Sequence, residues 1–278
     1  MRWYADNSEL NGIRGAIIPD VIMFGGVAVK PEHEFSLRRA IERAKGKWGA
    51  ERAPVKWNFK DLEKLYADRG LTKLHKDMLA TSKDWRLEIA KAASAFEFRI
   101  IVAVVEAHSV AKRTLKGVKP NLSGYAFSNG LMRFALYAKE EGPPSVQVIL
   151  DWPDKKDPKP FDSEYRAAFA EGKTAERKVS YHSGPLSSLN FYDCPAYVSM
   201  QHCTLLQFAD LVLGANRELV ECALGKKSTG FGVDFCKELR ENYHGYPTNI
   251  VGHGMSVSSR RSAFRACVKD YVDREVAI

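Results

Sequence analysis

The chain has 278 residues, of which 45% are hydrophobic, and this supports a substantial core in one large or two modest domains. The excess of 42 Lys and Arg residues over 34 Asp and Glu residues gives a net charge of +8, compatible with a polyanionic partner. The sequence has no apolar run near the roughly 18 residues of a membrane span, no signal-peptide pattern, and no P-loop or dinucleotide-binding motif. P-loop hydrolysis and hydride transfer are therefore disfavoured, and we expect a soluble, cytoplasmic protein without a membrane partner.

The cysteine pattern indicates neither a disulfide framework nor a structural zinc site. The five cysteines are odd in number and scattered, and none has the paired C-x-x-C spacing of a zinc ligand set. Reduced thiols in a cytoplasmic protein are the simplest interpretation.

The first 30 residues predict a β-hairpin. Arg2–Asp6 is the expected first strand, Asn11-Gly12 supplies turn residues, and Ile22–Val29 is the expected second strand. The pair Gly25-Gly26 inside that second strand indicates a bulge or a close approach of another backbone.

A mostly helical insertion is expected over residues 33–95, because leucines and other apolar residues recur there at helical spacing. The insertion is interrupted by a loop-like piece, Pro54–Phe59, which carries Lys56 and Trp57. Lysine beside an aromatic ring is a pattern that contacts phosphate and stacks a base, although a surface lysine next to a core tryptophan has the same appearance.

Strands and helices alternate through the rest of the chain. The near-continuous apolar run at 96–105 predicts a strand buried on both faces. The further expected elements are helix 123–141, strand 146–151, helix 163–170, strand 178–182, helix 204–224, helix 233–243 and a last helix from Ser262. This order predicts an α/β fold with a mixed sheet flanked by helices, and a parallel strand reached through a helix requires a right-handed crossover.

Three aspartates stand where this arrangement would bring them together. Asp6 closes the first expected strand, Asp151 closes the strand 146–151, and Asp210 lies on the polar stripe of helix 204–224. Clustered carboxylates repel one another unless a divalent cation neutralises them, and Mg²⁺ or Mn²⁺ prefers oxygen ligands. The alternatives stay open: Asp6 and Asp151 also suit hydrogen-bonded turns, and Asp210 also suits the wet face of an ordinary amphipathic helix.

Four short segments give the chain a family resemblance. They are Tyr4–Ser8, Phe24–Val27, Val148–Asp151 and Leu206–Leu211. With these segments the chain resembles the proteins of domain of unknown function 3800, a family regarded as ribonuclease-H-like. The resemblance covers most of the chain, and the segment Leu206-Gln207-Phe208-Ala209-Asp210-Leu211 is its most specific part.

The resemblance implies one ribonuclease-H-like domain over residues 1–278, with the helical insertion at about 33–95 between the second and third strands. It also implies a metal-dependent nuclease that hydrolyses phosphodiester bonds of DNA or RNA by a two-metal mechanism. Asp6, Asp151 and Asp210 would be both catalytic residues and ligands of Mg²⁺ or Mn²⁺. Asp193 and Glu106 are further candidate ligands.

Five residues are candidates for substrate binding: Lys56, Trp57, Asn7, Ser8 and Gln207. Basic pairs that suit a phosphate backbone, or equally a solvated surface, are Lys112-Arg113, Lys155-Lys156, Lys226-Lys227 and Arg260-Arg261.

Two departures from the family pattern support a rival hypothesis. Asn7 stands where members carry a second acidic residue, and the helix 123–141 has no carboxylate before Glu140. The rival is a catalytically inactive ribonuclease-H-like module that binds nucleic acid or serves a defence or mobile-element system. The sequence leaves open the choice between DNA and RNA and the oligomeric state.

Overall fold

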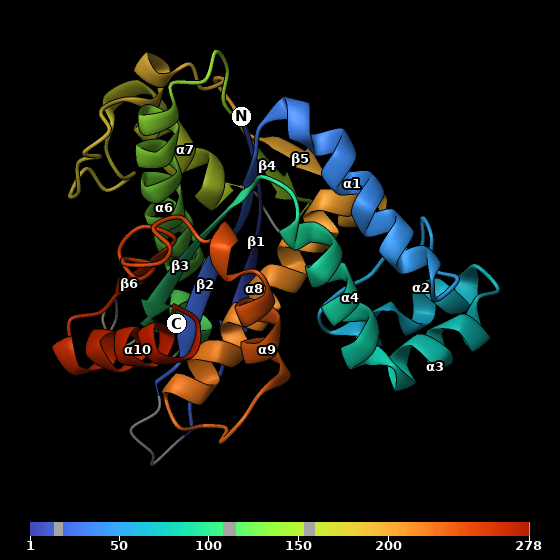
Figure 1. The fold of residues 1–278 in the computed structure, drawn as a ribbon. Helices are drawn as coiled ribbons and strands as arrows, with labels where there is room; N and C mark the ends of the chain where they lie inside the picture. The colour runs from blue at the N-terminus through green and yellow to red at the C-terminus, as the bar shows by residue number, and fades with distance from the viewer. Residues whose placement is uncertain (14–18, 108–114, 153–158, 278) are drawn as a thin grey trace.

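A mixed β-sheet lies between two layers of helices (Figure 1). The computed structural model describes residues 1–13, 19–107, 115–152 and 159–277. The sheet has six strands in the order β5-β4-β1-β2-β3-β6. The strands are β1 (Arg2–Leu10), β2 (Val21–Val29), β3 (Arg99–Glu106), β4 (Gln147–Asp151), β5 (Ala196–Val198) and β6 (Met255–Ser258). The predicted α/β class with a mixed sheet flanked by helices is confirmed.

The centre of the sheet is the N-terminal hairpin, in which β1 and β2 are antiparallel. β2 is antiparallel to β3, whereas β4 runs parallel to β1 and β5 runs parallel to β4. On the other edge, β6 runs parallel to β3. The chain therefore reaches β4 through a helical crossover, as the sequence indicated.

The predicted end of the first strand at Asp6 is wrong, because β1 continues to Leu10 by pairing with the start of β2. Asp6 consequently lies in the middle of the strand, opposite Gly25. Gly25 has a φ of 154°, and a Cβ there would stand 2.4 Å from the carbonyl oxygen of Ile101. The expected close backbone approach at this glycine is thus present, and it is the approach of β3.

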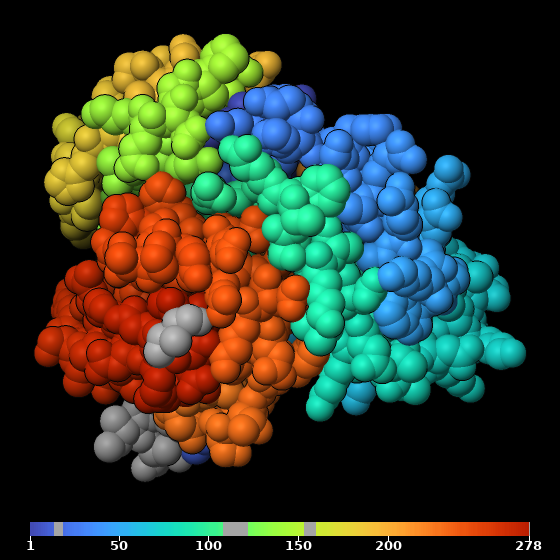
Figure 2. All heavy atoms as spheres, viewed as in Figure 1, coloured from blue at the N-terminus to red at the C-terminus, as the bar shows by residue number. Residues whose placement is uncertain are grey.

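The helices fall into three groups. Those of the insertion between β2 and β3 are α1 (Pro31–Gly46), η1 (Phe59–Leu62), α2 (Glu63–Asp68), α3 (Thr72–Ala80) and α4 (Ser82–Ser94). Two helices flank β4 along the chain, α6 (Leu115–Glu141) and α7 (Lys159–Glu171). The C-terminal part holds η2 (Leu186–Leu189), η3 (Met200–His202), α8 (Thr204–Ala223), α9 (Phe231–Glu238), η4 (Arg240–Asn242) and α10 (Ser262–Glu275). In the space-filling view the insertion forms a lobe at one side of the molecule (Figure 2).

Each face of the sheet has its own hydrophobic core, because successive side chains of a strand point to opposite faces. On β1, Trp3 packs into the core beneath α6 and α7, whereas Tyr4 packs into the core shared with α1, α4 and α8. On β4, Leu150 belongs to the first core and Ile149 to the second. The core shared with α8, called here the α8 face, is the one that carries the candidate site.

The strand predicted at 178–182 is wrong. That segment forms only an isolated bridge between Ser180 and Lys173, away from the main sheet. The strands that complete the sheet are instead the short β5 and β6, of three and four residues. Strands of this length carry too few residues to show an alternating pattern.

Within the described residues, every helix is too short or too polar to cross a lipid bilayer.

Candidate functional site

Asp6 and Asp151 are neighbours on the α8 face of the sheet. The parallel register of β1 and β4 runs to the pair Ala5 and Leu150, so Asp6 and Asp151 occupy the next position on each strand. Tyr4 and Ile149, two residues earlier, both pack into the core of the α8 face. Alternation along the strands therefore directs both carboxylates to that face.

Helix α8 brings Asp210 to the same place. The preceding residue, Ala209, packs so closely on the hairpin that a Cβ at Gly26 would lie 2.8 Å from its methyl carbon. Gly26 is paired with Ala5, so this contact sets the helix at the level of Asp6. Asp210, like Asp6 and Asp151, is half-buried. The predicted convergence of these carboxylates from two strands and one helix is therefore consistent with the arrangement of the elements.

The pKa values of Asp6 and Asp210 reflect the negative charges of neighbouring carboxylates. Burial raises the pKa of Asp6 to about 7, and the negative charges of Asp210 and Asp151 add to this rise. Burial also raises the pKa of Asp210 to about 6, against the opposing effects of a backbone N–H and Lys56. Proximity of like charges disfavours the ionised form, so the site gains from a positive charge placed among the carboxylates.

Lys56 supplies part of that positive charge. Burial lowers its pKa, but Asp210, Asp6 and Asp151 together act in the opposite direction and raise the pKa of the ammonium above its ordinary value. Lys56, a candidate substrate contact, therefore lies close enough to the aspartates for their charges to act on it.

Backbone N–H groups hold all three carboxylates. The N–H of Asn7 donates to Asp6 Oδ1 at 2.7 Å, and that of Met200 donates to Asp151 Oδ1 at 2.8 Å. The N–H of Trp57 donates to Asp210 Oδ2 at 2.5 Å. Each aspartate is therefore anchored to a different segment of the chain.

The donor atoms suit a hard cation, but no ligand cage is preassembled. Carboxylate oxygens are the ligands that Mg²⁺ and Mn²⁺ prefer. Nevertheless, across the described residues, no three or more His, Cys, Asp or Glu side chains are grouped closely enough to hold one metal ion. A metal would have to draw Asp6, Asp151 and Asp210 together.

The two neighbours of Asp6 face different ways. Ser8 lies on the same face as Asp6, and its hydroxyl accepts a hydrogen bond from Arg217 of α8 at 3.4 Å. Asn7 pairs with Phe24, which belongs to the core beneath α6. Alternation therefore directs the Asn7 side chain away from Asp6, and only its backbone N–H contributes to the site.

Glu106 does not lie with the three aspartates. Gly25 pairs with both Asp6 and Val102, so Glu106 is two strands away and four residues further along, about 13 Å in the strand direction. It is fully buried, and it is bonded by Arg261 and Ser259. Glu106 therefore has an ion-pair partner and a hydrogen-bond partner within the protein.

Asp193 lies at the opposite end of β4 from Asp151. Its neighbour Tyr192 donates its backbone N–H to the carbonyl of Val146, just before β4 begins, whereas Asp151 pairs with Val198. The structure thus separates Asp193 from the site, because β4 and β5 run parallel and the residue precedes β5.

Trp57 and Gln207 support the site from within. A Cβ at Gly214 would lie 2.1 Å from the Trp57 ring, which also stacks on Phe231 and lies under the guanidinium of Arg86. The Gln207 amide, only 3% exposed, accepts hydrogen bonds from Lys45 Nζ at 3.1 Å and the Val55 N–H at 3.2 Å. These contacts fasten the loop 54–57 to α8. The predicted substrate contacts of both residues stay predictions.

Two of the predicted basic pairs are engaged by carboxylates. Lys226 and Lys227 form ion pairs with Glu221, and Arg261 pairs with Glu106. The pairs Lys112-Arg113 and Lys155-Lys156 lie outside the described residues.

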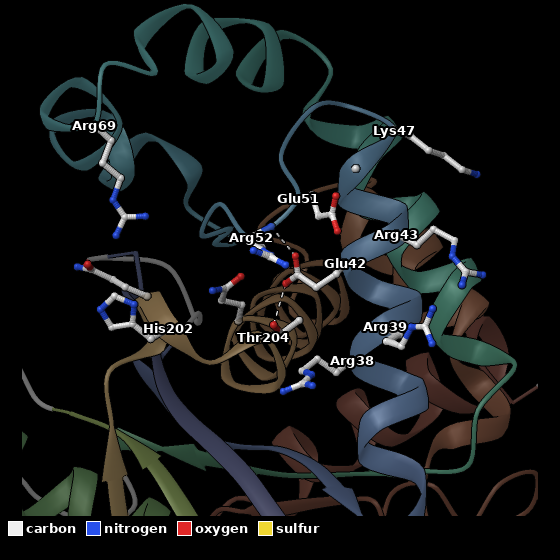
Figure 3. Close-up of a pocket in the computed structure, with 13 residues that line it drawn as sticks. Arg38, Arg39, Glu42, Arg43, Lys47, Glu51, Arg52, Arg69, His202 and Thr204 are labelled. Carbon is white, nitrogen blue, oxygen red and sulfur yellow. Dashed lines mark hydrogen bonds between the residues drawn. The ribbon is translucent and has the colours of Figure 1, made fainter.

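A basic cleft that the sequence patterns did not predict opens beside the site (Figure 3). Its volume is about 980 Å³, and it lies between α1, the end of α2 and η3. The basic cleft is lined by Arg38, Arg39, Glu42, Arg43, Gly46, Lys47, Glu51, Arg52, Arg69, Gln201, His202, Thr204 and Gln207. The sequence shows only part of this charge, the arginines Arg38, Arg39 and Arg43 of one helix, because Arg52 and Arg69 come from other segments.

Comparisons with protein-family models, with curated proteins and with solved structures found no match to this chain.

Proposed function

We propose that the protein is a metal-dependent nuclease with a ribonuclease-H-like core, acting on phosphodiester bonds. The single observation that carries the proposal is the placement of Asp6, Asp151 and Asp210 on the α8 face, from two adjacent parallel strands and the helix packed across them. The strand order, with an antiparallel hairpin at the centre and β4 parallel to β1, supports this fold assignment.

The oxygen donors fit Mg²⁺ or Mn²⁺, and Asp6, Asp151 and Asp210 would hold the metal. When bound, divalent ions supply an activated water and stabilise the leaving oxygen of an in-line displacement. The raised pKa of Asp6 arises from burial and from its acidic neighbours, so a cation placed there would relieve that repulsion.

The chain's own residues position the substrate. The Lys56 ammonium lies in the field of all three aspartates, where it would contact a non-bridging oxygen of the phosphate being cleaved. Arg217, held against Ser8, extends the positive charge along β1 and would contact the next phosphate. Basic groups on both sides of the carboxylates thereby orient the phosphodiester.

A second candidate is a nucleic-acid-binding module without turnover. The observation that favours it is that backbone N–H groups and Lys56 already stabilise the carboxylates. A site satisfied in this way folds without metal and does not require catalysis.

The test is cleavage of labelled DNA and RNA, in single- and double-stranded form, with Mg²⁺ or Mn²⁺. Asp6→Asn and Asp210→Asn are each expected to lower the rate about 1000-fold or more, since a catalytic metal contributes several kcal/mol. Asp193→Asn is the matched control, because Asp193 is exposed and distant, and it should cleave like the unaltered protein.

Metal binding separates the two candidates. Thermal stabilisation by Mn²⁺ that is present in the unaltered protein and Asp193→Asn, but lost in Asp6→Asn, supports the nuclease. Absence of both cleavage and metal stabilisation in the unaltered protein, with nucleic-acid binding retained, supports the binding module. Unchanged cleavage by Asp6→Asn and Asp210→Asn contradicts the assigned site.

A further inference from the structure

The basic cleft carries positive charge that the protein itself leaves available. Six Arg or Lys residues line it, against two glutamates. Arg38, Arg52 and Arg69 are exposed, and none of them forms an ion pair with a described carboxylate. Their guanidinium groups border the opening, whereas Arg39 and Arg43 lie on the outer side of α1 (Figure 3).

One of the two glutamates that line the basic cleft, Glu42, is already engaged by other groups of the protein. Glu42 forms an ion pair with Lys45 at 2.8 Å, and it also accepts hydrogen bonds from the Arg52 N–H and the Thr204 hydroxyl. Burial raises the pKa of Glu42, but these partners outweigh burial and hold its pKa below the ordinary value. Glu42 therefore organises the floor of the cleft, and the cleft keeps an excess of positive charge that suits an anionic ligand.

The basic cleft adjoins the carboxylates through three short connections. Met200, whose N–H is bonded to Asp151, is followed two residues later by His202 on the wall of the cleft. Gln207 on the floor precedes Asp210 by one turn of α8. Arg52 on the rim leads into the loop that carries Lys56.

The lining also limits what is recognised. Among the described residues that line the cleft, none is Phe, Tyr or Trp, so stacking platforms for bases are missing there. Arginine forks match phosphate oxygens in geometry and charge. A cleft of this composition suits contacts with the sugar-phosphate backbone of a nucleic acid, without contacts that distinguish one base from another.

We propose that the basic cleft binds the backbone phosphates of one nucleic-acid strand next to the bond that is cleaved, through Arg38, Arg52 and Arg69. This inference rests on the proposed function, because it gives the carboxylate site its substrate. The nucleic-acid strand passes from the cleft along η3 to Asp151, and its binding is independent of base sequence.

The experiment measures binding without cleavage. Fluorescence anisotropy with labelled single strands of about 15 nucleotides, a typical site size, is recorded in EDTA over a series of salt concentrations. DNA and RNA of the same sequence form separate arms, which identify the sugar that is preferred. Arg38→Glu/Arg69→Glu is expected to weaken binding at least about tenfold and to lower the salt slope by about 1.4, roughly 0.7 for each phosphate of a single strand that is no longer neutralised.

Arg166→Glu is the matched control, because Arg166 is exposed on α7 and lies on the other face of the sheet. It should bind like the unaltered protein. If the double reversal does not fold by thermal melting, Arg38→Gln/Arg69→Gln replaces it, with the same direction of effect.

Two results would overturn the inference: an unchanged dissociation constant and salt slope in the folded double variant, or competition by poly-glutamate as strong as by the oligonucleotide. The second result would indicate an acidic protein as the partner. Binding is read without metal, so its loss is distinguishable from failure of the nuclease, which appears only as missing cleavage.

Discussion

Glu106 and Asp6 are both carboxylates on strands of one sheet, yet their surroundings differ in kind. Glu106 is fully buried and bonded by Arg261 and Ser259. Asp6 is half-buried, and the charges that bear on it include two more carboxylates. Depth of burial alone therefore does not mark a functional acid. What distinguishes Asp6 is that the largest charges acting on it are those of two other carboxylates, only partly offset by Lys56.

The largest expected effect comes from separating α8 from the hairpin. In Gly26→Ala the new Cβ would stand 2.1 Å from the Tyr4 carbonyl oxygen and 2.8 Å from the Ala209 methyl. Because backbone atoms cannot yield, we expect a loss of about 3 kcal/mol in the free energy of unfolding, measured by urea denaturation. The thermal stabilisation of the protein by Mn²⁺ should also decrease, because the substitution moves Asp210 away from Asp6.

The control for this variant is Gly124→Ala on α6, where a Cβ would have only ordinary contacts at 3.6 Å or more. Alanine there should be neutral or slightly stabilising. If Gly26→Ala retains the stability of Gly124→Ala, the close packing does not position the site.

A smaller effect is expected at the paired carboxylate. Glu106→Gln removes the charge opposite Arg261, and we expect a loss of about 2 kcal/mol, less than for a fully buried pair because Arg261 is 47% exposed. Urea denaturation measures the loss, and a double-mutant cycle with Arg261→Met assigns it to the pair. Cleavage by folded Glu106→Gln should stay within about twofold of the unaltered protein. Its abolition would show that Glu106 belongs to the aspartate site.

The smallest effect is the dependence of stability on pH. The pKa of Asp6 is about 7 in the folded protein, above its value near 4 in the unfolded chain. The folded state therefore binds more protons between these values, and its stability falls as pH rises through that window. We expect Asp6 to account for on the order of 1 kcal/mol, because a half-buried group is partly screened by solvent.

Denaturation in EDTA at a series of pH values measures this slope, with Asp193→Asn as the control. Asp6→Asn should flatten the fall, and divalent cations should oppose it in the unaltered protein because they bind the ionised carboxylates. If the free energy of unfolding of Asp6→Asn varies with pH just as that of the control does, Asp6 ionises as freely as an exposed acid.

The central strands of the sheet, and the shared face of Asp6 and Asp151, were predictable because local patterns encode them. Apolar runs located β3 and β4, and the helical period around Asp210 placed that residue on the polar side of α8. Alternation then carries Asp6 and Asp151 to one face as soon as β1 and β4 are neighbours. The exact end of β1 was harder to predict from the sequence, because its last four residues are ordered by pairing with β2.

Features made by distant segments were not predictable. Glu106 and Arg261 are 155 residues apart, and nothing local in either segment indicates the other. The basic cleft joins α1 with Arg69 and His202, so its charge pattern exists only after the insertion packs beside α8. The packing of the Trp57 ring against Gly214 and Phe231 could not be read from the sequence either, because these residues meet only in three dimensions.

The backbone N–H of Trp57 donates a hydrogen bond to Asp210, which links a fluorescent residue directly to one of the three carboxylates. An ion that takes electron density from Asp210 Oδ2 weakens this bond and changes the field around the adjacent indole. The indole packs on Phe231 and Arg86, so we expect its emission to change when a cation binds the proposed site, and Trp57→Phe should remove that change.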